Sequence, residues 1–134
     1  MDKLVLSFVP IYTAFIIALG LMMFQRRMRA LRQGVVSVDL FKAYSGDEPE
    51  DLRIIRNHFS SQFEVPILFF VTCMAAVQIN KADFLTLLLG AVFILTRLIH
   101  SYIHLGSNNL RARAPSYFLG LVTVMIMCVH ILVV

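Results

Sequence analysis

Four polar side chains recur at helical spacing in one stretch that runs directly into an apolar segment. They are Arg53, Asn57, Ser60 and Glu64. At 100° per residue they fall within an arc of about 60°, so they share one narrow helical face. A carboxylate near hydrocarbon costs about 2.5–3.5 kcal/mol on insertion scales, so Glu64 must face protein or water. This polar face therefore predicts a functional site where a helix enters a membrane.

A second polar stripe follows in a later apolar segment. Arg97, His100 and His104 step by three and four residues, which places them on one helical face. Arg111 continues the same spacing seven residues further on, whereas Tyr102 falls off the stripe. We therefore expect two neighbouring helices to turn their ionisable side chains toward a common hollow.

The histidine spacing raises the question of a metal site. His100 and His104 are four residues apart, as in many metal-ligand pairs. A third ligand would have to be Glu64 or His58 from another helix, and no acidic or cysteine cluster accompanies the pair. We therefore predict no metal site, and we expect these histidines to form hydrogen bonds across helices.

Two interpretations of the buried charges stay open. In the first, Glu64 and Arg97 form an ion pair between two helices, because a lone charge at that depth needs a partner. In the second, they line a polar cavity that opens to the cytoplasm and binds an anionic ligand through bidentate arginine contacts. The number of groups favours the cavity, since one structural pair needs fewer than Arg53, Asn57, Glu64, Arg97, Arg111 and Arg113.

The composition indicates an integral membrane protein. Of its 134 residues 59% are hydrophobic, whereas about 45–50% is typical of soluble domains. The length suggests a single domain over residues 1–134. No basic patch carries interleaved aromatic residues, so we expect no nucleic-acid partner and take the lipid bilayer as the main one. Cys73 and Cys128 lie in apolar stretches, where we expect buried small hydrophobes rather than catalytic thiols.

The hydropathy pattern predicts an all-α membrane protein, an antiparallel bundle of four transmembrane helices. We expect Asp47 to cap the second helix and Pro66 to kink it. A short interfacial helix is expected over Asp39–Ser45, and Arg111 and Arg113 are expected in the connection before the last helix. The four expected spans are Leu4–Phe24, Pro49–Ile79, Asp83–Leu105 and Pro115–Val134.

The positive charges predict the orientation of this bundle. The connections after the first and third helices hold most of the arginines, whereas the other side holds only Lys3 and Lys81. By the positive-inside rule both termini face away from the cytoplasm. The first connection opens with an arginine cluster that we interpret as a topology signal and a contact with lipid headgroups. Its members are Arg26, Arg27, Arg29 and Arg32.

These features together resemble the MAPEG family, the membrane-associated proteins in eicosanoid and glutathione metabolism. The resemblance covers nearly the whole chain, and its fit is to small bacterial members, which implies a bacterial inner membrane. The residues that carry it are Arg26-Arg27, Arg53-x-x-x-Asn57, Glu64, Pro66, the stretch from Arg97 to His104, Pro115 and Tyr117.

The resemblance implies a homotrimer that binds glutathione as co-substrate between neighbouring protomers, with a lipophilic substrate entering from the bilayer. It implies that Arg53, Asn57 and Glu64 hold the charged ends of glutathione, while Arg111 or Arg113 stabilises its thiolate. A thiol of pKa about 8.5 becomes a nucleophile beside a cation. We assign Arg97, His100 and His104 to the same binding site. The implied activity is conjugation of the thiol to an electrophile or reduction of a lipid hydroperoxide.

The sequence departs from the family pattern at two points. The family's glutamate lies three residues after its asparagine, where this chain has Ser60, and Glu64 comes one turn deeper. The family's paired tyrosines of the third helix are replaced by His100 and His104. The alternative function is a non-catalytic membrane scaffold, in which the same polar residues are contacts between helices.

Overall fold

Every regular element of the computed structural model, which describes residues 1–43 and 46–133, is a helix. Among the described residues, four helical segments are long and apolar enough to cross a membrane: Asp2–Arg32, Glu50–Gln78, Phe84–Leu105 and Leu110–Val133. This confirms the predicted all-α bundle of four membrane-spanning helices. The bounds are α1 Asp2–Arg32, α2 Val38–Ala43, α3 Glu50–Ser61, α4 Val65–Gln78, α5 Phe84–Leu105 and α6 Leu110–Val133.

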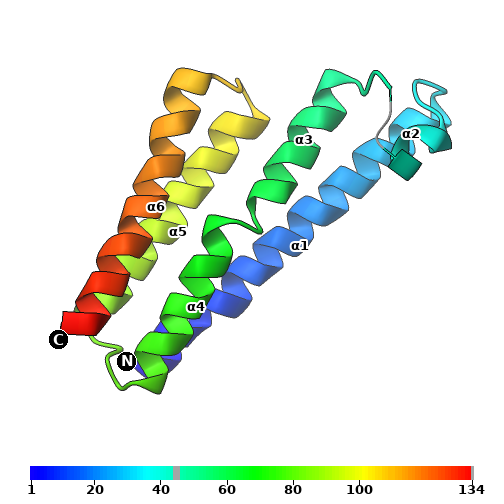
Figure 1. Cartoon of the computed structure of the whole chain (residues 1–134). Coiled ribbons are helices and arrows are strands. Elements are labelled where there is room, and N and C mark those ends of the chain that lie inside the picture. The colour runs from blue at the N-terminus through cyan, green and yellow to red at the C-terminus, as the bar shows by residue number, and fades with distance from the viewer. Residues whose placement is uncertain (44–45, 134) are drawn as a thin grey trace.

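The helices run up and down, and α5 pairs with α6 more extensively than with any other helix among those described (Figure 1). The long α1 lies beside both α3 and α4, which follow one another along it. Both termini and the α4–α5 turn lie at one end of the bundle, whereas α2 and the α5–α6 turn lie at the other. The arginine-bearing connections therefore gather at the end opposite the termini.

The second span is broken rather than merely kinked. α3 ends at Ser61, and α4 begins at Val65 with Pro66 in its first turn. The reason is that Pro66 has no N–H to donate to a preceding turn, a loss that has no consequence at a helix start. The expected cap was wrong: Pro49 stands at the N-cap, so Asp47 is two residues too early for its side chain to reach the first-turn N–H groups.

The last span begins five residues earlier than predicted. α6 starts at Leu110 because Asn109 Oδ1 accepts the backbone N–H of Arg111 at 3.0 Å, and Asn108 adopts the left-handed φ of 49° that turns the chain. Arg111 and Arg113 therefore lie on the first turn of α6, not in a connection, and Pro115 lies inside the helix.

The bounds of the second and third spans agree closely with the prediction, whereas the first span extends beyond it. Asp83 caps α5 by accepting the backbone N–H of Thr86 at 2.8 Å. α1 continues two turns past Phe24, so the arginine cluster lies on the helix itself. The interfacial helix was expected over Asp39–Ser45 and is present as α2; residues 44 and 45 lie outside the described residues.

The core lies where α1, α4, α5 and α6 meet. Phe69 and Phe93 are fully buried, and their rings stack with centroids 4.1 Å apart. Met127 and Val5 close the same cluster from α6 and α1. Cys73 is buried there too, as expected, whereas Cys128 is only partly buried. This apolar core occupies the end of the bundle near the termini and leaves the polar residues to the half beyond it.

Candidate functional site

Arg97 lies at the centre of the polar half and is fully buried on α5. Its Nε donates to the hydroxyl of Tyr12 at 3.4 Å. Its Nη1 and Nη2 are buried and have no hydrogen-bond partner among the residues that the structure describes. Unpaired donors on a buried cation are costly, so these two groups favour an anionic acceptor.

Tyr117 of α6 lies between the two charges that the sequence suggested as a pair. Its hydroxyl donates to Glu64 Oε2 at 2.7 Å, and the Arg97 guanidinium carbon lies 5.4 Å from the centroid of its ring. Glu64 and Arg97, both within the described part of the chain, form no ion pair with each other. Glu64 instead lies exposed at the break between α3 and α4. The ion-pair interpretation is therefore wrong.

A cavity of about 250 Å³ lies where the end of α3 meets the C-terminal half of α5 and the start of α6. Its lining is part polar and part apolar, which suits a ligand that carries both charged and hydrocarbon groups. The polar members are Ser61, His100, His104, Arg113 and Tyr117, and the apolar members are Leu110, Ala114 and Phe118.

A larger hollow of about 420 Å³ lies at the end of α1, with Arg26, Arg29 and Asp51 in its lining. No residue of the two polar stripes lines it. Two members of the arginine cluster line it, and the sequence assigns that cluster to lipid headgroups. This assignment stays a prediction. The smaller cavity is the better candidate because His100 and His104 of the polar stripe on α5 line it.

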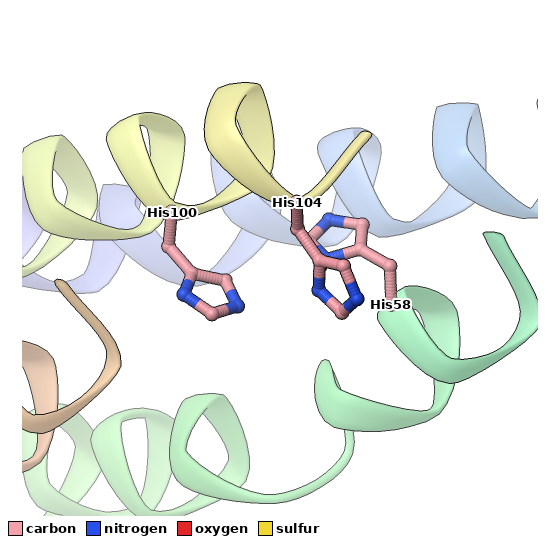
Figure 2. A group of neighbouring side chains, drawn as sticks. All are labelled: His58, His100 and His104. Atoms are coloured by element: carbon pink, nitrogen blue, oxygen red, sulfur yellow. The ribbon is translucent and has the colours of Figure 1, made fainter. Parts of the chain in front are cut away.

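Three buried histidines come together beside this cavity, His58 from α3 and His100 and His104 from α5 (Figure 2). His58 Nδ1 and His104 Nδ1 are 3.1 Å apart and share one hydrogen bond. His100 Nδ1 lies 3.2 Å from the carbonyl oxygen of Arg113. The predicted hydrogen bonds across helices are thus confirmed between α3 and α5 and between α5 and α6.

The histidine cluster continues into a network that reaches α1. Gln62 Nε2 donates to the carbonyl of His58 at 2.9 Å and lies 3.3 Å from His58 Nε2. The Tyr12 hydroxyl donates to Gln62 Oε1 at 2.7 Å, which fixes the amide in one orientation. Neither Tyr12 nor Gln62 was predicted from the sequence. Each is a polar side chain in or next to an apolar segment, and a polar group that is buried there needs a hydrogen-bond partner. That need could have identified both residues.

Only part of the predicted site meets at the cavity. His100, His104 and Arg113 line it. Arg97 and Glu64 do not line it, but both contact Tyr117, which does. Arg53, Asn57 and Ser60 lie exposed on the outer side of α3, and Arg111 is exposed at the start of α6. Helical spacing explains this exposure. The opposite side of α3 carries Leu52, Ile55 and His58, which are buried in the bundle.

Arg113 is held in place by the turn that precedes it. Its Nη1 donates to Asn108 Oδ1, and its backbone N–H donates to the carbonyl of Asn109 at 2.9 Å. The side chain therefore folds back over the start of α6, where unpaired helix N–H groups also favour negative charge.

A sequence model of the MAPEG family matches residues 6–133, which is nearly the whole chain. No curated protein and no solved structure matches the sequence of this chain. The match covers three spans completely and all but the first four residues of α1, and it includes every residue that lines the cavity.

Proposed function

Because the chain belongs to the MAPEG family of membrane proteins, we propose that it binds glutathione, or a similar small anionic thiol, and joins it to a lipophilic electrophile. Reduction of a lipid hydroperoxide by the same thiol is the related reaction. The supporting observation is the cavity, where Arg113, His100 and His104 stand among apolar residues. A polar thiol and a hydrocarbon-rich partner both find suitable surfaces there.

Within this proposal Arg113, rather than Arg111, stabilises the thiolate. Arg113 lines the cavity, whereas Arg111 lies exposed on the same helical turn. The guanidinium favours the ionised thiol over the neutral one, which raises the fraction of nucleophile at neutral pH. The sulfur then forms a bond to the electrophilic carbon, whose leaving group departs. The cavity contributes by holding the two reactants together away from water.

The outer face of α3 has a place in the same proposal. Arg53 and Asn57 are exposed in a single chain and lie on the side of α3 that faces away from the bundle. We propose that a neighbouring copy in a homotrimer covers this face, so that Arg53, Asn57 and Glu64 hold the charged ends of glutathione at the boundary. The arginine-rich end would face the cytoplasm of a bacterial inner membrane, with both termini on the other side.

A thermal-shift titration of the purified protein with glutathione tests binding directly, because a ligand of the folded state raises the melting temperature by mass action. Turnover is followed with a chloronitrobenzene electrophile. Arg113→Ala should lower kcat/KM about a hundredfold, as loss of one charge-stabilising donor does. Arg111→Ala is the matched control, because Arg111 lies two residues earlier on the same turn of α6 and is exposed, and this variant should retain most of the activity. Equal turnover in both variants would contradict the role of Arg113.

A second candidate function, the non-catalytic scaffold, has one observation in its favour. The bonds among Tyr12, Gln62, His58 and His104 tie α1, α3 and α5 together without any ligand. A scaffold predicts that no thiol raises the melting temperature and that the electrophile is not consumed. A shift without turnover would assign binding but not catalysis.

A further inference from the structure

The three buried histidines have the donor set of a metal site and lie close to one another. Each offers one ring nitrogen, and these nitrogens all lie within 4.8 Å of one another. Nitrogens bound to one zinc ion at about 2.0–2.1 Å lie roughly 3.4 Å apart in tetrahedral geometry. His58 Nδ1 and His104 Nδ1 are 3.1 Å apart already. We propose that His58, His100 and His104 bind one divalent transition-metal ion.

This proposal goes beyond thiol binding and does not depend on it. The sequence predicted no metal because the third ligand, Glu64 or His58, would have to come from another helix, and spacing alone does not place either one beside the pair on α5. The fold supplies that ligand, since α3 packs its buried face on α5 and brings His58 against His104. Figure 2 shows the three rings side by side between the two helices.

His100 is held as metal-bound histidines usually are. Its Nδ1 lies 3.2 Å from the carbonyl of Arg113 and 3.2 Å from Ser116 Oγ. The Ser116 hydroxyl donates to that same carbonyl at 2.7 Å, so both oxygens accept from the imidazole. The proton therefore sits on Nδ1, which leaves the lone pair on Nε2 for an ion. A carbonyl behind the ring is the common way to orient such a ligand.

The contact between His58 and His104 can accept an ion with a small rearrangement. In the hydrogen-bonded state one proton lies between the two Nδ1 atoms. With an ion in its place, each histidine carries its proton on Nε2. Gln62 Nε2 then gives up its 3.3 Å contact with His58 Nε2, but keeps the His58 carbonyl at 2.9 Å and Ser61 Oγ at 3.3 Å. Three bonds to the ion then replace two contacts, the one between His58 and His104 and the one between Gln62 and His58 Nε2.

The surroundings define which ion fits and what completes its shell. Three imidazoles suit zinc, cobalt, nickel or copper, whereas magnesium and calcium require oxygen ligands. His100 and His104 also line the cavity, so the fourth position opens into it, as in catalytic rather than structural zinc sites. Arg97 and Arg113 add positive charge nearby, which opposes a bare cation and favours an anion as the fourth ligand.

The test uses the whole protein, purified without a polyhistidine tag, treated with a chelator and then titrated with Co²⁺ in chloride buffer. The expected result is a visible absorption band of tetrahedral cobalt that saturates at one ion per chain and is displaced by Zn²⁺ but not by Mg²⁺. Asn substitutions at each of His58, His100 and His104 should abolish the band. His130→Asn is the control, since His130 pairs with Asp83 near the termini and should leave it intact.

Absence of the band in the wild type, with zinc at background after dialysis, would overturn the proposal. So would a band that survives all three substitutions or disappears in His130→Asn. If a substituted protein does not fold, the wild type still decides: Zn²⁺ should raise its melting temperature and Mg²⁺ should not. Measuring glutathione binding by the chelator-treated protein separates the two proposals. If the metal-free protein binds glutathione, the proposal of thiol binding holds even when the cobalt titration gives no band.

Discussion

The hydroxyl of Tyr117 donates to the carboxylate of Glu64 across 2.7 Å and so ties α6 to the break between α3 and α4. The ring of the same tyrosine lies 5.4 Å from the guanidinium carbon of Arg97. One aromatic side chain thus stands between an exposed carboxylate and a buried cation. The charge of Arg97 is left for something other than Glu64 to balance.

Tyr117→Phe should lower the melting temperature modestly while keeping the ring against Arg97. A hydrogen bond of this kind contributes about 0.5–1.5 kcal/mol, and the exposure of Glu64 places it toward the lower end. Thermal unfolding in detergent measures the change. Tyr102→Phe is the control, because Tyr102 is 84% exposed and off the polar stripe. An equal loss in both variants would show that the bond to Glu64 contributes nothing.

Arg97→Met should leave the melting temperature of the ligand-free protein unchanged or raise it. Both Nη groups of Arg97 lack an acceptor among the described residues, so an apolar side chain of similar length removes an uncompensated charge. If Arg97 serves an anionic ligand, the same variant loses most of the shift that glutathione produces. A large fall in ligand-free stability would instead mark Arg97 as structural.

Arg53→Ala and Asn57→Ala test the boundary between protomers. Both residues are exposed in the single chain, so neither substitution should unfold it. In the proposed homotrimer they should weaken glutathione binding about tenfold or more, as loss of a charge-assisted contact does. Native mass spectrometry in detergent reports the number of chains. A monomer that binds glutathione with full affinity would contradict the shared site.

Asp83 provides a pH-dependent contribution to stability outside the membrane spans. Asp83 Oδ1 accepts the backbone N–H of Thr86 at 2.8 Å, and His130 Nε2 lies 2.8 Å from Asp83 Oδ2. These contacts, the one with Thr86 above all, hold the pKa of the Asp83 carboxyl below its usual value. Because the pKa is lower in the folded state, the ionised carboxylate stabilises the folded protein at pH values above the unfolded pKa of about 3.9. This contribution to stability is lost as the pH falls through the folded pKa. Melting temperatures at neutral and acidic pH measure it.

Asp83→Asn isolates the charge in that experiment, because asparagine caps a helix about as well as aspartate. The wild type should melt higher than the variant at neutral pH, and the difference should shrink below about pH 4. A difference that stays constant down to acidic pH would rule out the linkage.

Much of the bundle was predictable because hydropathy and helical spacing are local properties. The four spans and the shared face of Arg97, His100 and His104 follow from one turn of helix and the thickness of a bilayer. Two errors in helix boundaries were local as well: Asp47 as a cap, and Pro115 as the start of the last span. Each arose where backbone polar groups had more than one possible partner.

What only the tertiary structure decided is which helical face meets which. Spacing shows that Arg53 and Asn57 share a face and that His58 is opposite, but not that the His58 face packs on α5. That choice brings His58 to His104 and leaves Arg53 outside the bundle. It depends on how whole helices rotate and pack, which many distant side chains determine together, and no single stretch of sequence carries that information.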